Sequence, residues 1–298
     1  MNTTRTTRLL LLNLVALAIL VAIAPNTQGA DPFVAGGRST RAVAVSRGQS
    51  DRALVRAAEV SKALGLPGVT RNVARLDDRF EHRTYDEVTS FDGRGREVAI
   101  TRLDLDGRVV MALVLGWQRG HGPAVNSAAA ERLAAKHVAA AGLAVSGKPT
   151  IHASAGAGGW SVTWTRVVDG IAVPGDGVRV TLWSDGSFHG LARQERPLAA
   201  IPTSPISDAD ARSAAEAFIA RRFAGNGSDA LRLVSAELAW LASNDTWDAG
   251  RPDAPEGTLR LGWIVRFEAT GALAERLRLV QVWVNAADRS ILGGDVAE

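Results

Sequence analysis

The sequence predicts an α+β protein made of tandem units, each with one helix packed on a three- to four-stranded antiparallel sheet. Three alanine-containing segments have helical spacing, and strand-like runs follow each of them. The helices begin at intervals of about 80 residues, which indicates an internal repeat. With 46% hydrophobic residues and no cysteine among 298, the chain has the composition of a globular protein stabilised by packed cores and not by disulfides.

The start of the chain has the pattern of an export signal. Two arginines and no acid precede an apolar run at 9–24, and small and polar residues follow up to Ala30. A basic start, a short apolar run and a small-residue exit are typical of a secretory signal peptide, whereas a membrane span needs roughly 20 apolar residues. We expect a signal peptide at 1–29 and a linker at 30–48. The alternative is an uncleaved membrane anchor.

Cleavage at this point determines the expected location and charge of the mature chain. The mature protein would be secreted or located in the cell envelope, with no integral membrane segment. The formal net charge of +3 includes the two arginines of the leader, so the mature chain is close to neutral. A nearly balanced charge excludes the electrostatic footprint of a nucleic-acid-binding protein.

The three helices are expected at 50–64, 126–141 and 207–223. Each begins at a serine or asparagine, whose side-chain oxygen can accept an otherwise unpaired backbone N–H. The third has the clearest start, since Ser207 and Asp210 form the S-x-x-D pattern of a capping box.

Strand-like runs follow each helix, and in two units an Asp-Gly pair separates two such runs. This pair favours a tight hairpin turn because glycine tolerates a positive φ. The runs lie at 97–105 and 109–115 in the first unit, at 159–168, 177–183 and 187–192 in the second, and at 259–268, 277–285 and 290–292 in the third. The predicted units therefore span 49–118, 124–196 and 205–298, with an inserted loop at 243–257.

One cluster of charged residues lies in the first unit outside these runs. Its members are Arg75, Asp77, Asp78, Arg79, Glu81, Arg83 and Asp86. Without a strand pattern to pair them, we expect these side chains to form a solvated charged face.

The second unit carries a recognisable string at 164–193. Its central part, Val168-Asp-Gly-Ile-Ala-Val-Pro-Gly-Asp-Gly, precedes Val178-Arg-Val and the pair Asp185-Gly186. This string resembles the PepSY superfamily, and more narrowly the YcdB/YcdC-type repeats and the fungalysin/thermolysin propeptide domains. The segment 283–292 resembles the ending of PepSY domains. The chain departs from the family pattern at Ala172, where proline is usual, and at 289–290, where Arg-Ser replaces Thr-Gly.

This resemblance implies tandem cystatin-like units without catalytic residues. In peptidase precursors such domains precede a zinc peptidase, where they block its cleft or assist its folding. The resemblance therefore implies a secreted, non-catalytic protein that binds an exported metallopeptidase as an inhibitor or folding helper. The candidate binding residues lie in the predicted turns and in the inserted loop, and they are Ile171, Val173, Pro174, Asp176, Asp185, Gly186 and Trp247.

Motifs of catalysis and metal binding are missing from the sequence. There is no His-Glu-x-x-His, the five histidines are not at ligand spacing, and no serine lies in G-x-S-x-G. We therefore expect no catalytic residue, no metal site and no cofactor. Two alternatives remain open: an envelope scaffold or assembly factor that binds another exported protein or a cell-wall polymer, and a hydrolase of unrecognised type.

Overall fold

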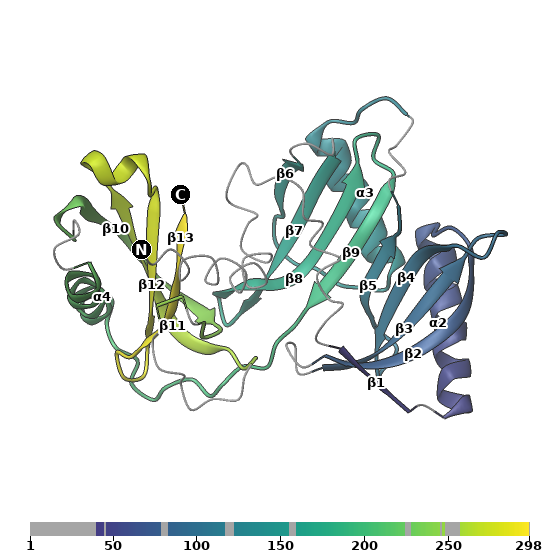
Figure 1. The fold of residues 1–298 in the computed structure, drawn as a ribbon, viewed down its shortest axis with the longest axis horizontal. Coiled ribbons are helices and arrows are strands. Elements are labelled where there is room, and N and C mark those ends of the chain that lie inside the picture. Colours follow the sequence, from purple (N-terminus) through teal and green to yellow (C-terminus); the bar gives the residue numbers. More distant parts are fainter. Residues whose placement is uncertain are drawn as a thin grey trace, which may run out of the picture. The chain divides into compact units, whose positions relative to one another are not determined.

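A computed structural model describes residues 40–44, 46–78, 83–116, 122–154, 159–223, 228–244, 246–247 and 257–297. These residues form three α-helices and two antiparallel sheets, of nine and four strands (Figure 1). The chain divides into two compact units. The first runs up to Thr165 and includes Gly175–Gln194, whereas Arg166–Pro174 and the chain from Glu195 onward form the second. The predicted signal peptide lies outside the described residues.

The first unit contains the nine-stranded sheet and two helices. The strands follow the order β1-β2-β3-β4-β5-β9-β8-β7-β6 across the sheet. The elements are β1 (Thr40–Val43), α2 (Arg47–Leu64), β2 (Val69–Asp78), β3 (Arg83–Phe91), β4 (Glu97–Asp104), β5 (Val109–Val114), α3 (Ser127–Ala140), β6 (Thr150–Ser154), β7 (Gly159–Val168), β8 (Ile171–Trp183) and β9 (Phe188–Gln194).

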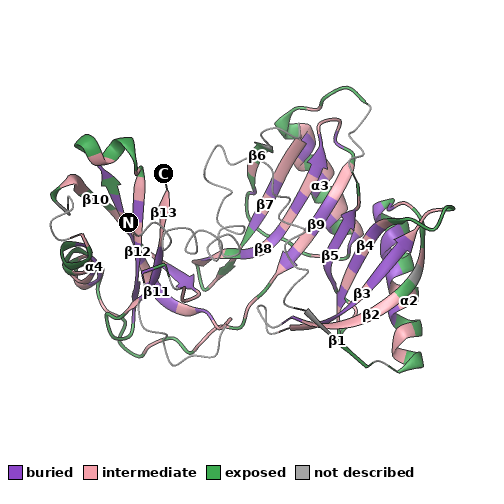
Figure 2. Cartoon of the chain, viewed as in Figure 1, coloured by how far each residue is buried: buried purple, intermediate pink, exposed green. Residues whose placement is uncertain are grey.

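Both helices of the first unit contribute to one hydrophobic core with the strands. The small side chains of Ala57 on α2 and of Ala130 and Ala134 on α3 are fully buried. They pack with strand residues such as Val88 and Leu191, while the opposite sides of the helices carry exposed residues (Figure 2). Because alanine has a small side chain, each helix can lie close to the sheet at these positions.

The first two predicted units share a single sheet, so the expectation of separate small sheets is wrong for them. Strand β5 pairs with β9 through Met111–Ala192, Ala112–Leu191 and Leu113–Gly190. Every residue of β5 is buried. A continuous apolar run of this kind is typical of a strand inside a sheet, and leaving it at an edge would expose its backbone to other chains.

The beginning of the first unit also differs from the expectation. Thr40–Val43, in the predicted linker, forms β1 and pairs with β2. Helix α2 begins at Arg47, earlier than expected, because Gln49 Oε1 accepts the Ser46 N–H at 3.1 Å and serves as a cap. The other two helices lie within one residue of their predicted ends.

The charged cluster of the first unit lies partly on β2 and β3, which the sequence patterns did not predict, while its members Arg79 and Glu81 lie outside the described residues. Arg75 and Asp86 stand opposite each other in the register of these strands. The guanidinium donates two hydrogen bonds to the carboxylate, at 2.8 and 2.9 Å, and the side chains are 13% and 9% exposed. The hydrogen bond to Asp86 raises the pKa of Arg75. The expectation of a solvated face is therefore wrong for this pair.

We expect Asp86→Ala to lower the free energy of unfolding by about 2–3 kcal/mol, because it leaves the Arg75 guanidinium without its carboxylate at a mostly buried position. The measurement is urea unfolding followed by circular dichroism. The control is Glu268→Ala, which breaks an exposed pair with Arg232 and should cost about 0–1 kcal/mol. Equal losses for the two variants would contradict the structural importance of the Arg75–Asp86 pair.

The second unit contains α4 (Asp208–Arg222), β10 (Leu231–Leu241), β11 (Arg260–Ala269), β12 (Leu279–Asn285) and β13 (Ile291–Ala297). The four strands follow one another in sequence order across the sheet. Helix α4 begins as predicted, since Ser207 Oγ accepts the Asp210 N–H at 3.1 Å. Its buried residues Ala215 and Ile219 pack with the sheet.

A second hydrophobic cluster of this unit includes the tip of the β7–β8 hairpin. Val173 from this tip packs with Trp240, Leu259, Leu261 and Ala286. The second unit therefore takes in residues 166–174, which precede the predicted third unit by about thirty positions along the chain.

Candidate binding surfaces

In the described part of the chain, no group of three or more histidines and carboxylates could hold a metal ion. None of the helices among these residues is both long and apolar enough for a membrane span.

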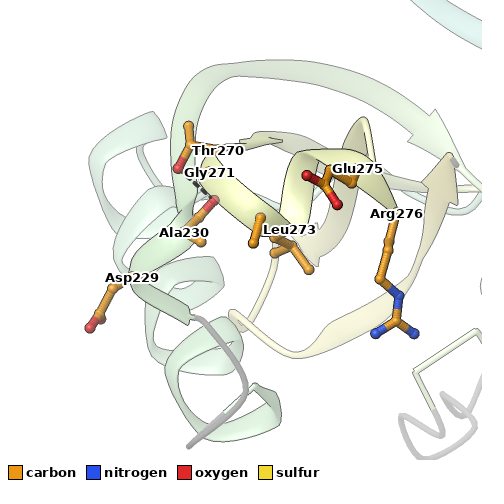
Figure 3. A pocket seen from close by; sticks show the side chains of 8 residues that line it. Asp229, Ala230, Thr270, Gly271, Leu273, Glu275 and Arg276 are labelled. Atoms are coloured by element: carbon orange, nitrogen blue, oxygen red, sulfur yellow. Dashed lines mark hydrogen bonds between the residues drawn. The ribbon is translucent and has the colours of Figure 1, made fainter.

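One depression, of about 700 Å³, is broad and open and belongs to the second unit (Figure 3). Its lining includes Ala230, Leu273, Glu275 and Arg276. Thr270, also in this lining, uses its hydroxyl to donate to the Ala230 carbonyl oxygen at 3.0 Å. The polar side chains shown in Figure 3 do not converge on a common point, so the depression offers no evident site for chemistry.

The first predicted binding turn contains Ile171, Val173, Pro174 and Asp176, and the first three of these residues belong to the second unit. Val173 is fully buried, and Ile171 is half-buried against the same cluster. The carbonyl oxygen of Pro174 accepts a hydrogen bond from Arg196 at 3.0 Å, and Asp176 is buried. Of these four residues, Ile171 and Pro174 retain part of their surface, whereas the side chains of Val173 and Asp176 do not reach the exterior.

The second predicted region, Asp185-Gly186, forms the β8–β9 turn as expected. The Asp185 carboxylate accepts the Ser187 hydroxyl at 2.6 Å and backbone N–H groups of Ser187 and Gly122. These hydrogen bonds, that of the Ser187 hydroxyl above all, lower the pKa of Asp185. Gly186 is buried with a φ of +82°, and a Cβ there would lie 2.5 Å from Leu133 on α3. The turn is therefore seated against the helix.

The third predicted residue, Trp247, is a core residue of the second unit. It is 8% exposed, and its indole N–H donates to the Gln281 carbonyl oxygen at 3.1 Å. Its ring makes edge contacts with Phe218 and Phe223, at centroid distances of 5.9 and 6.2 Å. Most of the predicted inserted loop, at 245 and 248–256, lies outside the described residues.

The outer edges of the two sheets are the remaining places where another chain could add. In the second unit, Asn244 occupies the edge of β13: its amide donates to the Gly294 carbonyl oxygen at 2.8 Å and accepts the Gly294 N–H at 3.0 Å. The opposite edge strand, β10, has an irregularity between Leu233 and Ser235. It also carries charged side chains that pair across to β11. Bulges, charges and covering segments are devices that protect sheet edges.

The edges of the first unit are short. Strand β1 has four residues, one of them an arginine, and β6 has five. Strand β6 reads Thr-Ile-His-Ala-Ser and has no Asp, Glu, Lys, Arg or proline; its register with β7 is unbroken. The sequence patterns did not predict this strand.

A partly buried carboxyl group on β13 makes a test of pH dependence possible. Burial raises the pKa of Asp295 above its ordinary value of 3.8, although the Val296 N–H donates to it at 2.8 Å. Because folding raises this pKa, the protonated Asp295 carboxyl makes its full contribution to stability below the ordinary pKa. This contribution is lost as the pH rises through the pKa of Asp295 in the folded state.

We expect Asp295→Asn to unfold at a higher temperature than the natural chain near pH 7, because the variant cannot ionise and keeps an oxygen that can accept the Val296 N–H. The two proteins should converge below about pH 4, where the carboxyl is protonated in both states. Thermal unfolding across this range measures the difference. A difference that does not change with pH would contradict the assignment to ionisation.

Comparison with known proteins yields a likeness of fold only. No family model matches the chain, and no curated protein matches its sequence. Among solved structures, the chain is similar to the Bacillus megaterium YpeB C-terminal domain, with a TM-score of 0.47 and 14% identity over 85% of this chain and 98% of that one. A similarity at this level carries no information about function.

Proposed function

We propose that this chain is an exported, non-catalytic protein that binds an exported metallopeptidase and inhibits it or assists its folding. The observation that carries the proposal is the propeptide-like string at 164–193. In the structure this string occupies the greater part of the β7–β8 hairpin and strand β9. The export pattern at 1–29 supports a location outside the cytoplasm or in the envelope.

The packing of the predicted turns changes how such binding would occur. Val173 and Trp247 belong to hydrophobic cores, and the Asp185 turn is hydrogen-bonded to Gly122 in the segment before α3. Apolar residues that stabilise a fold are not free to enter the cleft of a partner. The proposed binding therefore relies on the outer strands of the sheets, by strand addition, in which main-chain hydrogen bonds provide much of the affinity.

Affinity capture from the native secretome tests the proposal. The mature chain is immobilised, culture supernatant is passed over it, and the eluted proteins are identified. We expect a metallopeptidase in the eluate. In a second assay with that purified enzyme, the chain should reduce its activity at stoichiometric amounts or raise its refolding yield.

Val167→Asp, which changes an exposed residue of the β7–β8 hairpin away from the outer strands, serves as a control that should leave the capture unchanged. Absence of any peptidase from the eluate, together with unchanged peptidase activity after deletion of the gene, would refute the proposal. Recovery of structural envelope proteins or cell-wall polymer alone would favour the scaffold instead. Turnover of generic esters or peptides by the folded chain would favour a hydrolase.

A further inference from the structure

We propose that the outer edge of β6 is a strand-addition site for an extended, largely uncharged peptide segment of a protein partner. This inference deepens the proposed function, on which its biological meaning rests. It assigns the contact to Thr150–Ser154, away from the turns that the sequence suggested.

Among the described residues, no strand pairs with the backbone groups on the outer side of β6. The strand is the last in the order of the nine-stranded sheet, and in the described part of the chain it pairs with β7 alone. Alternate residues of an antiparallel edge strand direct their N–H and C=O groups away from the sheet. A row of alternating donors and acceptors at this spacing is complementary to an extended polypeptide backbone, which identifies the occupant as a peptide segment.

The strand is held in place before any partner arrives. Five consecutive residue pairs join it to β7 without a shift of register. Ile151 packs against the hydrophobic core of the first unit. Binding to an ordered edge avoids the entropy cost of forming the strand at the moment of association.

In the part of the chain that the structure describes, β6 has none of the covering segments, irregularities or charged side chains found on the other three outer strands. Asn244 covers part of β13, an irregularity and charged side chains interrupt β10, and β1 is shorter and contains an arginine. By contrast, the side chains of Thr150, His152 and Ala153 are exposed, and the strand has no acidic residue, lysine or arginine. An unprotected edge in a folded protein is available for pairing.

The side chains of β6 also indicate the composition of the added strand. Successive side chains of a strand alternate between the two faces of a sheet, so Thr150 and His152 share one face and Ile151 and Ala153 the other. A peptide beside β6 would present polar residues next to the first pair and small or apolar residues next to the second. We therefore expect a segment with alternating polar and apolar residues.

Selection from a phage-displayed library of random ten-residue peptides tests this site with the folded, full mature chain. The test variants are His152→Lys and Ala153→Lys, because lysine on an edge strand opposes pairing. The matched control is Val234→Lys, which places the same charge at an exposed position of β10. Ala153→Thr keeps the strand uncharged and should retain binding.

We expect selected peptides to lose at least tenfold in affinity for both β6 lysine variants and to bind the Val234→Lys and Ala153→Thr variants as they bind the natural chain. Peptide binding should slow hydrogen exchange of the amides of Thr150–Ser154. Absence of any selected peptide, equal affinity for all variants, or protection confined to another strand would overturn the proposal. Unchanged thermal unfolding of the variants ensures that a loss of binding is not a loss of fold.

The same variants separate this inference from the proposed function. If a metallopeptidase is captured equally well by the natural chain and by both β6 lysine variants, the edge is not the contact, although the proposed function stands. If no peptidase is captured while the peptides still require β6, the proposed function fails and the strand-addition site remains.

Discussion

Gly294→Ala should unfold the second unit or lower its free energy of unfolding by more than about 3 kcal/mol. A Cβ at this position would overlap the indole nitrogen of Trp247 and the carbonyl oxygen of Gln281. These two groups are hydrogen-bonded to each other, and Asn244 bonds both backbone groups of Gly294. Neither neighbour can move without breaking these bonds, so the added methyl group has no space.

Thermal unfolding followed by tryptophan fluorescence measures this effect, because Trp247 itself reports on the site. The control is Gly48→Ala in the first turn of α2, where a Cβ would meet no atom within 4 Å. That change should be neutral or should stabilise the chain by up to about 1 kcal/mol, since alanine is the better helix former. Similar stabilities for the two alanine variants would show that Gly294 is not enclosed as described.

Val173→Asp should destabilise the second unit by about 3–5 kcal/mol, because it buries a carboxylate that has no cationic partner in the cluster. Val173 is fully enclosed by residues of this unit, among them Trp240 and Leu261. The effect is measured by urea unfolding with tryptophan fluorescence, and the transition of the first unit, followed by hydrogen exchange in α2, should be unchanged.

The matched control is Val167→Asp, on the same hairpin at a side chain that is 55% exposed. It should change the free energy of unfolding by no more than about 0.5 kcal/mol. If Val173→Asp were equally mild, the hairpin tip would not be part of the core of the second unit, and the predicted role of this turn in partner binding would regain support.

The local features of the fold followed directly from neighbouring residues in the sequence. Ser207 and Asn126 cap their helices as predicted, because an N-cap is a hydrogen bond across three residues. The turn at Asp106-Gly107 connects β4 and β5, since a glycine with a φ of +78° needs only its own backbone freedom. The α+β class followed in the same way, from residue periods within short segments.

The candidate binding surfaces could be predicted only in part. The Asp185 turn was found because its signal is local, but its seating on α3 depends on Leu133, about fifty residues earlier. A valine or a tryptophan has the same chemical nature in a binding patch as in a core. The residue type alone therefore could not show whether Val173 and Trp247 bind a partner or stabilise the fold. Among the described residues β6 pairs only with β7, and its place at the edge of the sheet depends on the order of all the strands, which no local pattern records.

By itself, the sequence determined which segments are helical, where α3 and α4 are capped and where the two Asp-Gly turns occur, because these choices depend on contacts within a few residues. Only the tertiary structure decided that β5 pairs with β9, that Arg75 faces Asp86, and that the β7–β8 tip completes the core of the second unit. The β5–β9 pairing and the contacts of Val173 join positions far apart in the chain, whereas Arg75 and Asp86 lie on neighbouring strands that the sequence patterns did not predict. Tertiary pairing depends on which strand edges and apolar faces are still uncovered after the local elements have formed. Because these edges and faces compete for partners across the whole unit, no short segment decides the outcome alone.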